Sequence, residues 1–184
     1  MRVISGKSRG TKINTIESIT TRPTLDRVKE SLFNIIQNNI KDKIVLDLFA
    51  GSGALGIESL SRGAQKAYFC DSNKEAIRVI KQNLTKTKLA EKSKIYNEDF
   101  IKCLNTINEK IDIVFLDPPY KLDLAVKAVK EILRNKLLND NGIIIIETDE
   151  INRDLKELEE LESISITDKR KYGRANLIFI NEEK

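Results

Sequence analysis

The chain has 184 residues, 40% of them hydrophobic, which is enough for the core of one domain and leaves little for a separate substrate-binding domain. Its net charge of +4 suits a polyanionic partner but does not require one, because many proteins that bind no nucleic acid carry a similar charge. The sequence has no histidine, two isolated cysteines and only short apolar runs, so it excludes imidazole catalysis and predicts a cytoplasmic protein with no metal and no membrane partner.

The first 40 residues differ from the rest and predict an N-terminal extension packed on one compact domain of residues 41–184. Two short strands, Arg2–Ser5 and Thr11–Ile13, are expected to flank a cation-rich turn at Gly6–Gly10. A helix should follow, because apolar side chains recur there at helical spacing, namely Leu25, Val28, Leu32, Ile35 and Ile36.

From Lys43 onward, short apolar runs alternate with helical patterns, which indicates a parallel sheet covered by helices. The expected strands are Ile44–Leu48, Ala67–Cys70, Lys94–Tyr96, Ile111–Leu116 and Ile143–Glu147. The expected helices carry apolar stripes at Ile77, Ile80 and Leu84, then at Leu122, Ala125, Val126, Val129, Ile132 and Leu133, then at Ile151, Leu155, Leu158 and Leu161. A capping box of Ser72 and Glu75 is expected to begin the first of these helices.

Two more strands are expected near the end of the chain, Ile164–Thr167 and Ala175–Ile180. The basic segment between them, residues 168–173, reads as a connecting loop. The sheet would then have seven strands, mostly parallel, with an antiparallel last strand.

A glycine-rich loop follows the strand at Ile44–Leu48, with glycines at 51, 53 and 56 in a G-x-G-x-x-G pattern. Glycine permits a tight turn and a close approach of the backbone to a ligand at a helix N-terminus. Dinucleotide-binding proteins share this pattern, and a purely structural turn is a further alternative. Asp47 favours S-adenosylmethionine, because a carboxylate would repel a pyrophosphate but attract the sulfonium and ammonium charges.

Acidic residues also follow the next two strands. Asp71 can accept hydrogen bonds from ribose hydroxyls, and Asp99 with Phe100 could hold an adenine, although a helix N-cap explains Asp99 equally well. The expected cofactor-binding residues are Asp47, Phe49, Gly51, Gly53, Asp71, Ser72, Asp99 and Phe100.

The segment Asp117-Pro118-Pro119-Tyr120 follows the strand Ile111–Leu116, at the edge where open α/β sheets bind ligands. Two successive prolines stiffen the loop and remove two backbone donors, so it presents acceptors, the Asp117 carboxylate and the Pro118 carbonyl. Two rigid acceptors can hold both N–H groups of an aromatic amine for in-line methyl transfer, and Tyr120 can stack on the base. These four residues are the expected catalytic residues, although the prolines could also merely end a strand.

The segments Asp47–Gly53 and Asp117–Tyr120 resemble class I S-adenosylmethionine-dependent methyltransferases, whose α/β fold is Rossmann-like. More specifically, Ile4–Gly10, Thr21–Phe33 and Gly53–Gly63 resemble the RsmD family of bacterial 16S rRNA guanine-N2 methyltransferases. The resemblance covers essentially the whole chain.

This resemblance implies methylation of a guanine N2 in 16S rRNA of the small ribosomal subunit or its assembly intermediate, by a protein that we expect to be a monomer. It implies that Gly51, Gly53 and Asp71 bind S-adenosylmethionine. It also implies RNA or substrate binding by Arg2, Lys7, Arg9, Lys12, Arg22 and Thr24. The exposed cations could equally keep a surface hairpin soluble.

Three other functions stay open on the sequence. The same acceptor loop could present adenine N6 of DNA or RNA for methylation. A ribosome-assembly RNA-binding factor could carry a vestigial cofactor site. A nicotinamide-dependent oxidoreductase is disfavoured by Asp47 and by the absence of histidine.

Overall fold

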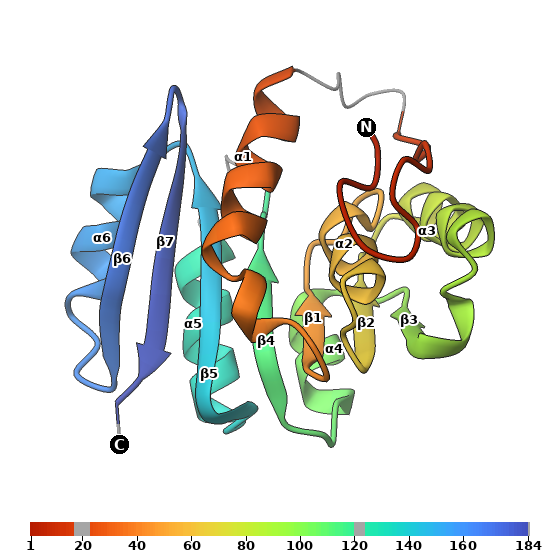
Figure 1. The fold of residues 1–184 in the computed structure, drawn as a ribbon. Helices are drawn as coiled ribbons and strands as arrows, with labels where there is room; N and C mark the ends of the chain where they lie inside the picture. Colours follow the sequence, from red (N-terminus) through yellow and green to blue (C-terminus); the bar gives the residue numbers. More distant parts are fainter. Residues whose placement is uncertain (17–22, 120–123, 184) are drawn as a thin grey trace.

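The computed structural model describes residues 1–16, 23–119 and 124–183, with only the backbone described at 23–25. Within these ranges the chain forms one seven-stranded sheet in the order β3-β2-β1-β4-β5-β7-β6 (Figure 1). Strands β1 to β5 are parallel neighbours, whereas β7 pairs antiparallel with both β5 and β6. The predicted α/β class, with a mostly parallel sheet and an antiparallel last strand, is confirmed.

The strands are β1 (Ile44–Asp47), β2 (Lys66–Cys70), β3 (Ser93–Tyr96), β4 (Ile111–Leu116), β5 (Leu138–Thr148), β6 (Ile164–Tyr172) and β7 (Ala175–Glu182). The helices are α1 (Pro23–Ile35), α2 (Ala54–Ser61), α3 (Lys74–Thr87), α4 (Phe100–Thr106), α5 (Leu124–Arg134) and α6 (Ile151–Leu158), with short 3-10 turns at Gln37–Asn39 and Ala90–Lys92.

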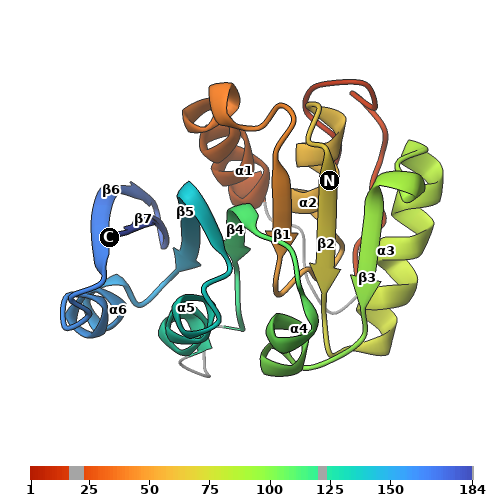
Figure 2. The ribbon, with the colours of Figure 1, turned by 90° about the horizontal axis from the view of Figure 1, so that it is seen from below.

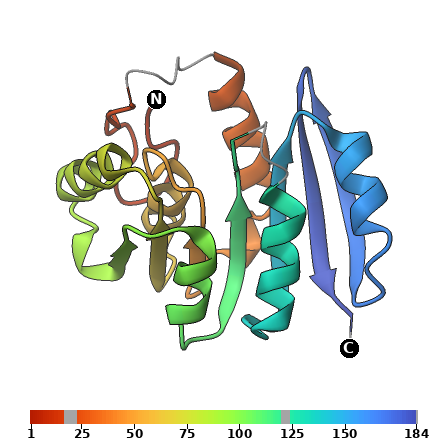
Figure 3. The same ribbon diagram turned by 180° about the vertical axis from the view of Figure 1, so that it is seen from behind.

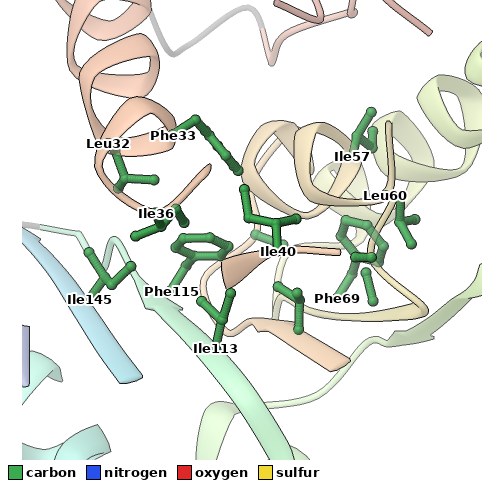
Figure 4. Packing of buried hydrophobic residues seen from close by; sticks show 14 of the residues in the cluster. Leu32, Phe33, Ile36, Ile40, Ile57, Leu60, Phe69, Ile113, Phe115 and Ile145 are labelled. Carbon is green, nitrogen blue, oxygen red and sulfur yellow. The ribbon is translucent and has the colours of Figure 1, made fainter. Parts of the chain in front are cut away.

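Helices cover both faces of the sheet. Helices α1, α2 and α3 lie on one face, and α4, α5 and α6 lie on the other (Figures 2 and 3). Each face therefore has its own apolar core. In the core under α1, Leu32, Phe33 and Ile36 point at Phe115 of β4 and Ile145 of β5 (Figure 4). This packing fixes α1 across β4, whose carboxyl end carries the Asp-Pro-Pro segment, and across its neighbour β5.

The N-terminal hairpin, residues 1–13, is closed by a single bridge between Arg2 and Lys12 rather than by two regular strands. The Val3 N–H donates to the Thr11 carbonyl at 3.0 Å, and the Gly10 N–H donates to the Val3 carbonyl at 2.9 Å. Val3 and Ile13 are buried in the same core as α1 and α2. The hairpin is thus anchored through its apolar side chains, while its cations face outward.

The basic segment at 168–173 is not the connecting loop that the sequence pattern predicted. Strand β6 continues through it to Tyr172, which pairs with Ala175 of β7, so the connection is only Gly173 and Arg174. Gly173 has φ +63°, a left-handed conformation that suits a tight two-residue hairpin turn. Pairing with the backbone of β7 outweighs the low strand preference of a charged segment. The tip of this hairpin reaches the sheet edge where β4 and β5 end (Figure 1).

Candidate active site

The glycine loop joins β1 to α2 at the carboxyl edge of the sheet. Gly51 and Gly53 have φ values of +53° and +77°, which other residues rarely adopt, and Gly53 is the N-cap of α2. A Cβ on Gly56 would lie 2.3 Å from the Phe69 ring of β2, so glycine is needed there for close helix–strand packing. A Cβ on Gly51 would meet nothing within 4 Å, so the space over the loop is open to a ligand.

Asp71, the residue after β2, holds the glycine loop in place. Its Oδ2 accepts a hydrogen bond from the Gly51 N–H at 2.9 Å, and its Oδ1 accepts one from the Asn73 N–H at 2.8 Å. A carboxylate has about four acceptor positions, so these two bonds leave about two of them unused.

The predicted capping box of Ser72 and Glu75 is wrong. Asn73 is the N-cap of α3, and its side chain accepts from the Glu75 N–H at 2.9 Å. An asparagine one residue closer to the helix supplies a strong cap. Ser72 is exposed beside Asp71, where it stays a predicted cofactor contact.

Asp99 and Phe100 lie after β3. Asp99 is the N-cap of α4 and accepts from the Lys102 N–H at 3.1 Å, as the alternative interpretation of this residue expected. The centroid of the Phe100 ring lies 5.6 Å from the centroid of the Phe49 ring, and both residues are partly buried. Phe49 comes shortly after the end of β1. The two aromatic residues predicted from separate strand ends are therefore brought together.

Residues Asp117, Pro118 and Pro119 follow β4 at the same edge, and Tyr120 lies outside the described residues. Asp117 is half-buried, Pro118 is buried and Pro119 is exposed. Burial raises the pKa of Asp117 to about 6. At neutral pH the Asp117 carboxylate is therefore ionised and only weakly basic.

Asp47 is almost fully buried at the end of β1, at 2% exposure, and its Oδ2 accepts from the Gly56 N–H at 3.0 Å. Burial raises the pKa of Asp47 to about 8, and the charges of Asp117 and Asp71 add to this increase, whereas the hydrogen bond from Gly56 lowers the pKa. Burial and the Asp117 charge likewise raise the pKa of Glu147, near the end of β5, to about 8. A cation placed beside these carboxyls would stabilise their ionised forms.

The hairpin cations Arg2, Lys7, Arg9 and Lys12 are exposed. The Arg2 guanidinium donates to the Gly10 carbonyl at 3.2 Å, which turns part of it back to its own hairpin. Arg22 lies outside the described residues, and Thr24 is described only as part of the first turn of α1. The placement of these two residues near a substrate stays a prediction.

The sequence pattern missed two buried glutamates. Glu58 of α2 is fully buried and accepts from the backbone N–H groups of Ile4 and Ser5 at 2.8 and 3.0 Å. Glu147, at 9% exposure, lines a small pocket together with Pro118 and Pro119. An acid at the end of an apolar strand was the one available signal for Glu147, whereas nothing near Glu58 in the sequence indicates its distant partners.

Among residues 1–16, 23–119 and 124–183, no helix is long and apolar enough to cross a membrane. Over the same described part of the chain, no group of three or more acidic or cysteine side chains is placed to hold a metal ion. Cys70 and Cys103 are buried thiols without a disulfide.

Comparisons with known proteins agree with this architecture. The family described as "Conserved hypothetical protein 95" matches residues 1–181. "Ribosomal RNA small subunit methyltransferase D" of Haemophilus influenzae is 39% identical, with 81% of this chain and 79% of the relative covered. The Escherichia coli K12 protein of the same name is 36% identical, with 81% of this chain and 75% of the relative covered.

Among solved structures, "Putative methyltransferase yhhF from Escherichia coli" is 29% identical with a TM-score of 0.85, and the superposition covers 100% of this chain and 98% of that one. The match extends through the N-terminal hairpin, the sheet and the last strand pair. The chain therefore belongs to the conserved hypothetical protein 95 family, which is the RsmD family that its motifs resemble.

Proposed function

We propose that the protein transfers a methyl group from S-adenosylmethionine to the exocyclic N2 of a guanine in 16S rRNA of the small ribosomal subunit. The observation that carries this proposal is the placement of the Asp117-Pro118 acceptors at the same sheet edge as the glycine loop and Asp71. A site for an amine thus adjoins a site for a nucleoside cofactor.

The residues present suit S-adenosylmethionine. The open space over Gly51 would admit the cofactor, and the remaining acceptor positions of Asp71 would bind its ribose hydroxyls. Asp47 and its acidic neighbours would bind a ligand that carries positive charge on its sulfonium and ammonium groups. Phe49 and Phe100 offer apolar ring surface for an adenine. When bound, the cofactor supplies an electrophilic methyl group.

Asp117 and Pro118 would orient the amine. An ionised Asp117 carboxylate and the Pro118 carbonyl can each accept one N–H of an aromatic amino group, which aims the nitrogen toward the cofactor side of the edge. The buried Pro118 holds this acceptor pair rigidly. With its pKa near 6, Asp117 can also take up the proton that the amine loses, and no histidine is required.

Ribosomal RNA is supported as the substrate by the two relatives named ribosomal RNA small subunit methyltransferase D. The exposed cations of the N-terminal hairpin would contact phosphates. Lys169, Lys171 and Arg174 of the β6–β7 hairpin are exposed as well and would supply further phosphate contacts. The division at residue 40, a monomeric state and a cytoplasmic location stay predictions.

Labelled S-adenosylmethionine and small subunits that lack the native modification would test the proposal. We expect the wild-type protein to transfer label, and Asp117→Ala to lose transfer while its calorimetric affinity for the cofactor stays within a few-fold. Asp112→Asn is the control, because this aspartate lies on the same strand near its opposite end and bonds to the Ile44 N–H at 2.8 Å. Cofactor binding without turnover in the wild type would instead support a binding factor.

A further inference from the structure

Glu147 is a buried acid with an unused oxygen. Its residue exposure is 9%, and within the described part of the chain its Oε1 has no hydrogen-bond partner. Buried polar atoms in native proteins are nearly always satisfied, and those that are not often belong to functional sites. A buried carboxyl of this kind therefore requires an explanation that packing alone does not supply.

The carboxyl lies beside the amine-binding loop. Strands β4 and β5 pair through Leu116 and Ile146; Asp117 directly follows the end of β4, and Glu147 is the next residue of β5. Side chains alternate along a strand, so Glu147 lies on the same face as Ile145, under α1. Asp117 follows Phe115 by two residues and so continues on the same face, which places the Glu147 carboxyl beside the Asp117 carboxyl that would hold the amine.

We propose that the Glu147 carboxyl binds the N1–H and O6 edge of the target guanine, beside the amino group that Asp117 and Pro118 hold. This inference rests on the proposed function and adds the residue that recognises the base. In guanine the ring N1–H lies next to the amino group, and O6 follows it. A carboxyl that keeps its proton can accept from N1–H through one oxygen and donate to O6 through the other.

The protonation state of Glu147 suits this role. Burial and the nearby Asp117 charge raise its pKa to about 8, so at neutral pH the group keeps its proton. The β7 residue paired with Glu147 is the apolar Leu177, and helix α6, which carries Arg153 and Asp154, packs on the opposite face of the sheet. Adenine has an acceptor at N1 and only a C–H at the following ring position, so it would leave one carboxyl oxygen unpaired.

Two substitutions separate recognition from a structural role. Glu147→Gln keeps one acceptor and one donor in the same shape, and we expect its kcat/KM on unmodified small subunits to stay within about threefold of wild type. Glu147→Leu removes both, and we expect at least a tenfold loss of kcat/KM with unchanged cofactor affinity. Because it also removes a buried, unpaired acid, its thermal midpoint should equal or exceed that of wild type.

Asn176→Leu is the matched control. Asn176 is 3% exposed, and its Oδ1 has no hydrogen-bond partner within the described chain. It lies on β7 opposite Thr148, near the same edge of the sheet. Its side chain points to the opposite face from those of Leu177 and Glu147, because side chains alternate along a strand. We expect its kcat/KM to stay within twofold of wild type. Wild-type kcat/KM in Glu147→Leu would overturn the inference, as would equal losses in both Glu147 variants with a lowered thermal midpoint. Absence of N2-methylguanosine from the wild-type reaction would instead overturn the proposed function itself.

Discussion

Replacing Glu58 by glutamine tests what attaches the N-terminal hairpin to helix α2. Besides the two backbone N–H groups, Glu58 accepts from the Arg62 Nε at 2.8 Å and lies 3.5 Å from the Nζ of Lys29, which is 4% exposed. Removing one partner of a buried ion pair costs about 3–5 kcal/mol of unfolding free energy. For a chain of this size, about 2–4 °C of melting temperature accompanies each kcal/mol, which gives a decrease of about 6–20 °C.

A double-mutant cycle in urea would check this value. Glu58→Gln, Lys29→Met and the double variant should show a coupling energy of at least about 1 kcal/mol, because the two side chains share one network. Burial lowers the pKa of Lys29 while the Glu58 charge raises it, so loss of that charge in Glu58→Gln would lower the pKa of Lys29 further. The exposed pair of Glu75 and Arg78 provides a control, Glu75→Gln, that should leave the unfolding midpoint unchanged. A Glu58→Gln variant within 1 kcal/mol of wild type, or additive single effects, would refute the reasoning.

Three further predictions concern charge. Replacing Lys7, Arg9 and Lys12 together by alanine should weaken small-subunit RNA binding and reduce the salt slope by up to about 3, measured by filter binding at several salt concentrations, because each cation releases about one counterion. The melting temperature should fall as pH rises from about 4 to 8, since the folded state holds a proton on Asp47 that the unfolded chain releases, and Asp47→Asn should reduce this slope. Asp71→Ala should raise the calorimetric Kd for S-adenosylmethionine at least tenfold while RNA binding is unchanged, and equal Kd values would remove Asp71 from the cofactor site.

Local pattern was sufficient to predict most of the fold. Apolar runs such as Ile113–Leu116 became buried parallel strands, and the stripe of Ile77, Ile80 and Leu84 became the buried face of α3. The extension of β6 through a basic segment was not predictable in this way, because its pairing with β7 is a tertiary interaction that outweighs the local preference. The helix start at Asn73 was missed because two adjacent residues can both act as caps.

In the candidate site, too, residues marked by local sequence pattern were predicted, and residues placed by tertiary pairing were missed. Asp71 and the Asp117 loop were identified because they directly follow strands, and Asp99 because it comes shortly after β3, since strand ends meet at one edge of a parallel sheet. Glu147 was missed because its position beside Asp117 exists only once β5 pairs with β4. Glu58 was missed because its backbone partners Ile4 and Ser5 lie more than 50 residues away in the chain.

The most direct measurement is the identity of the methylated nucleoside. Small subunits that lack the native modification would be incubated with the protein and labelled S-adenosylmethionine, digested completely, and resolved by mass and retention time. A site in which Asp117 and Pro118 hold a guanine amino group predicts that the label is recovered as N2-methylguanosine from 16S rRNA. Label recovered as N6-methyladenosine, or subunits left unlabelled by a protein that binds the cofactor, would contradict it.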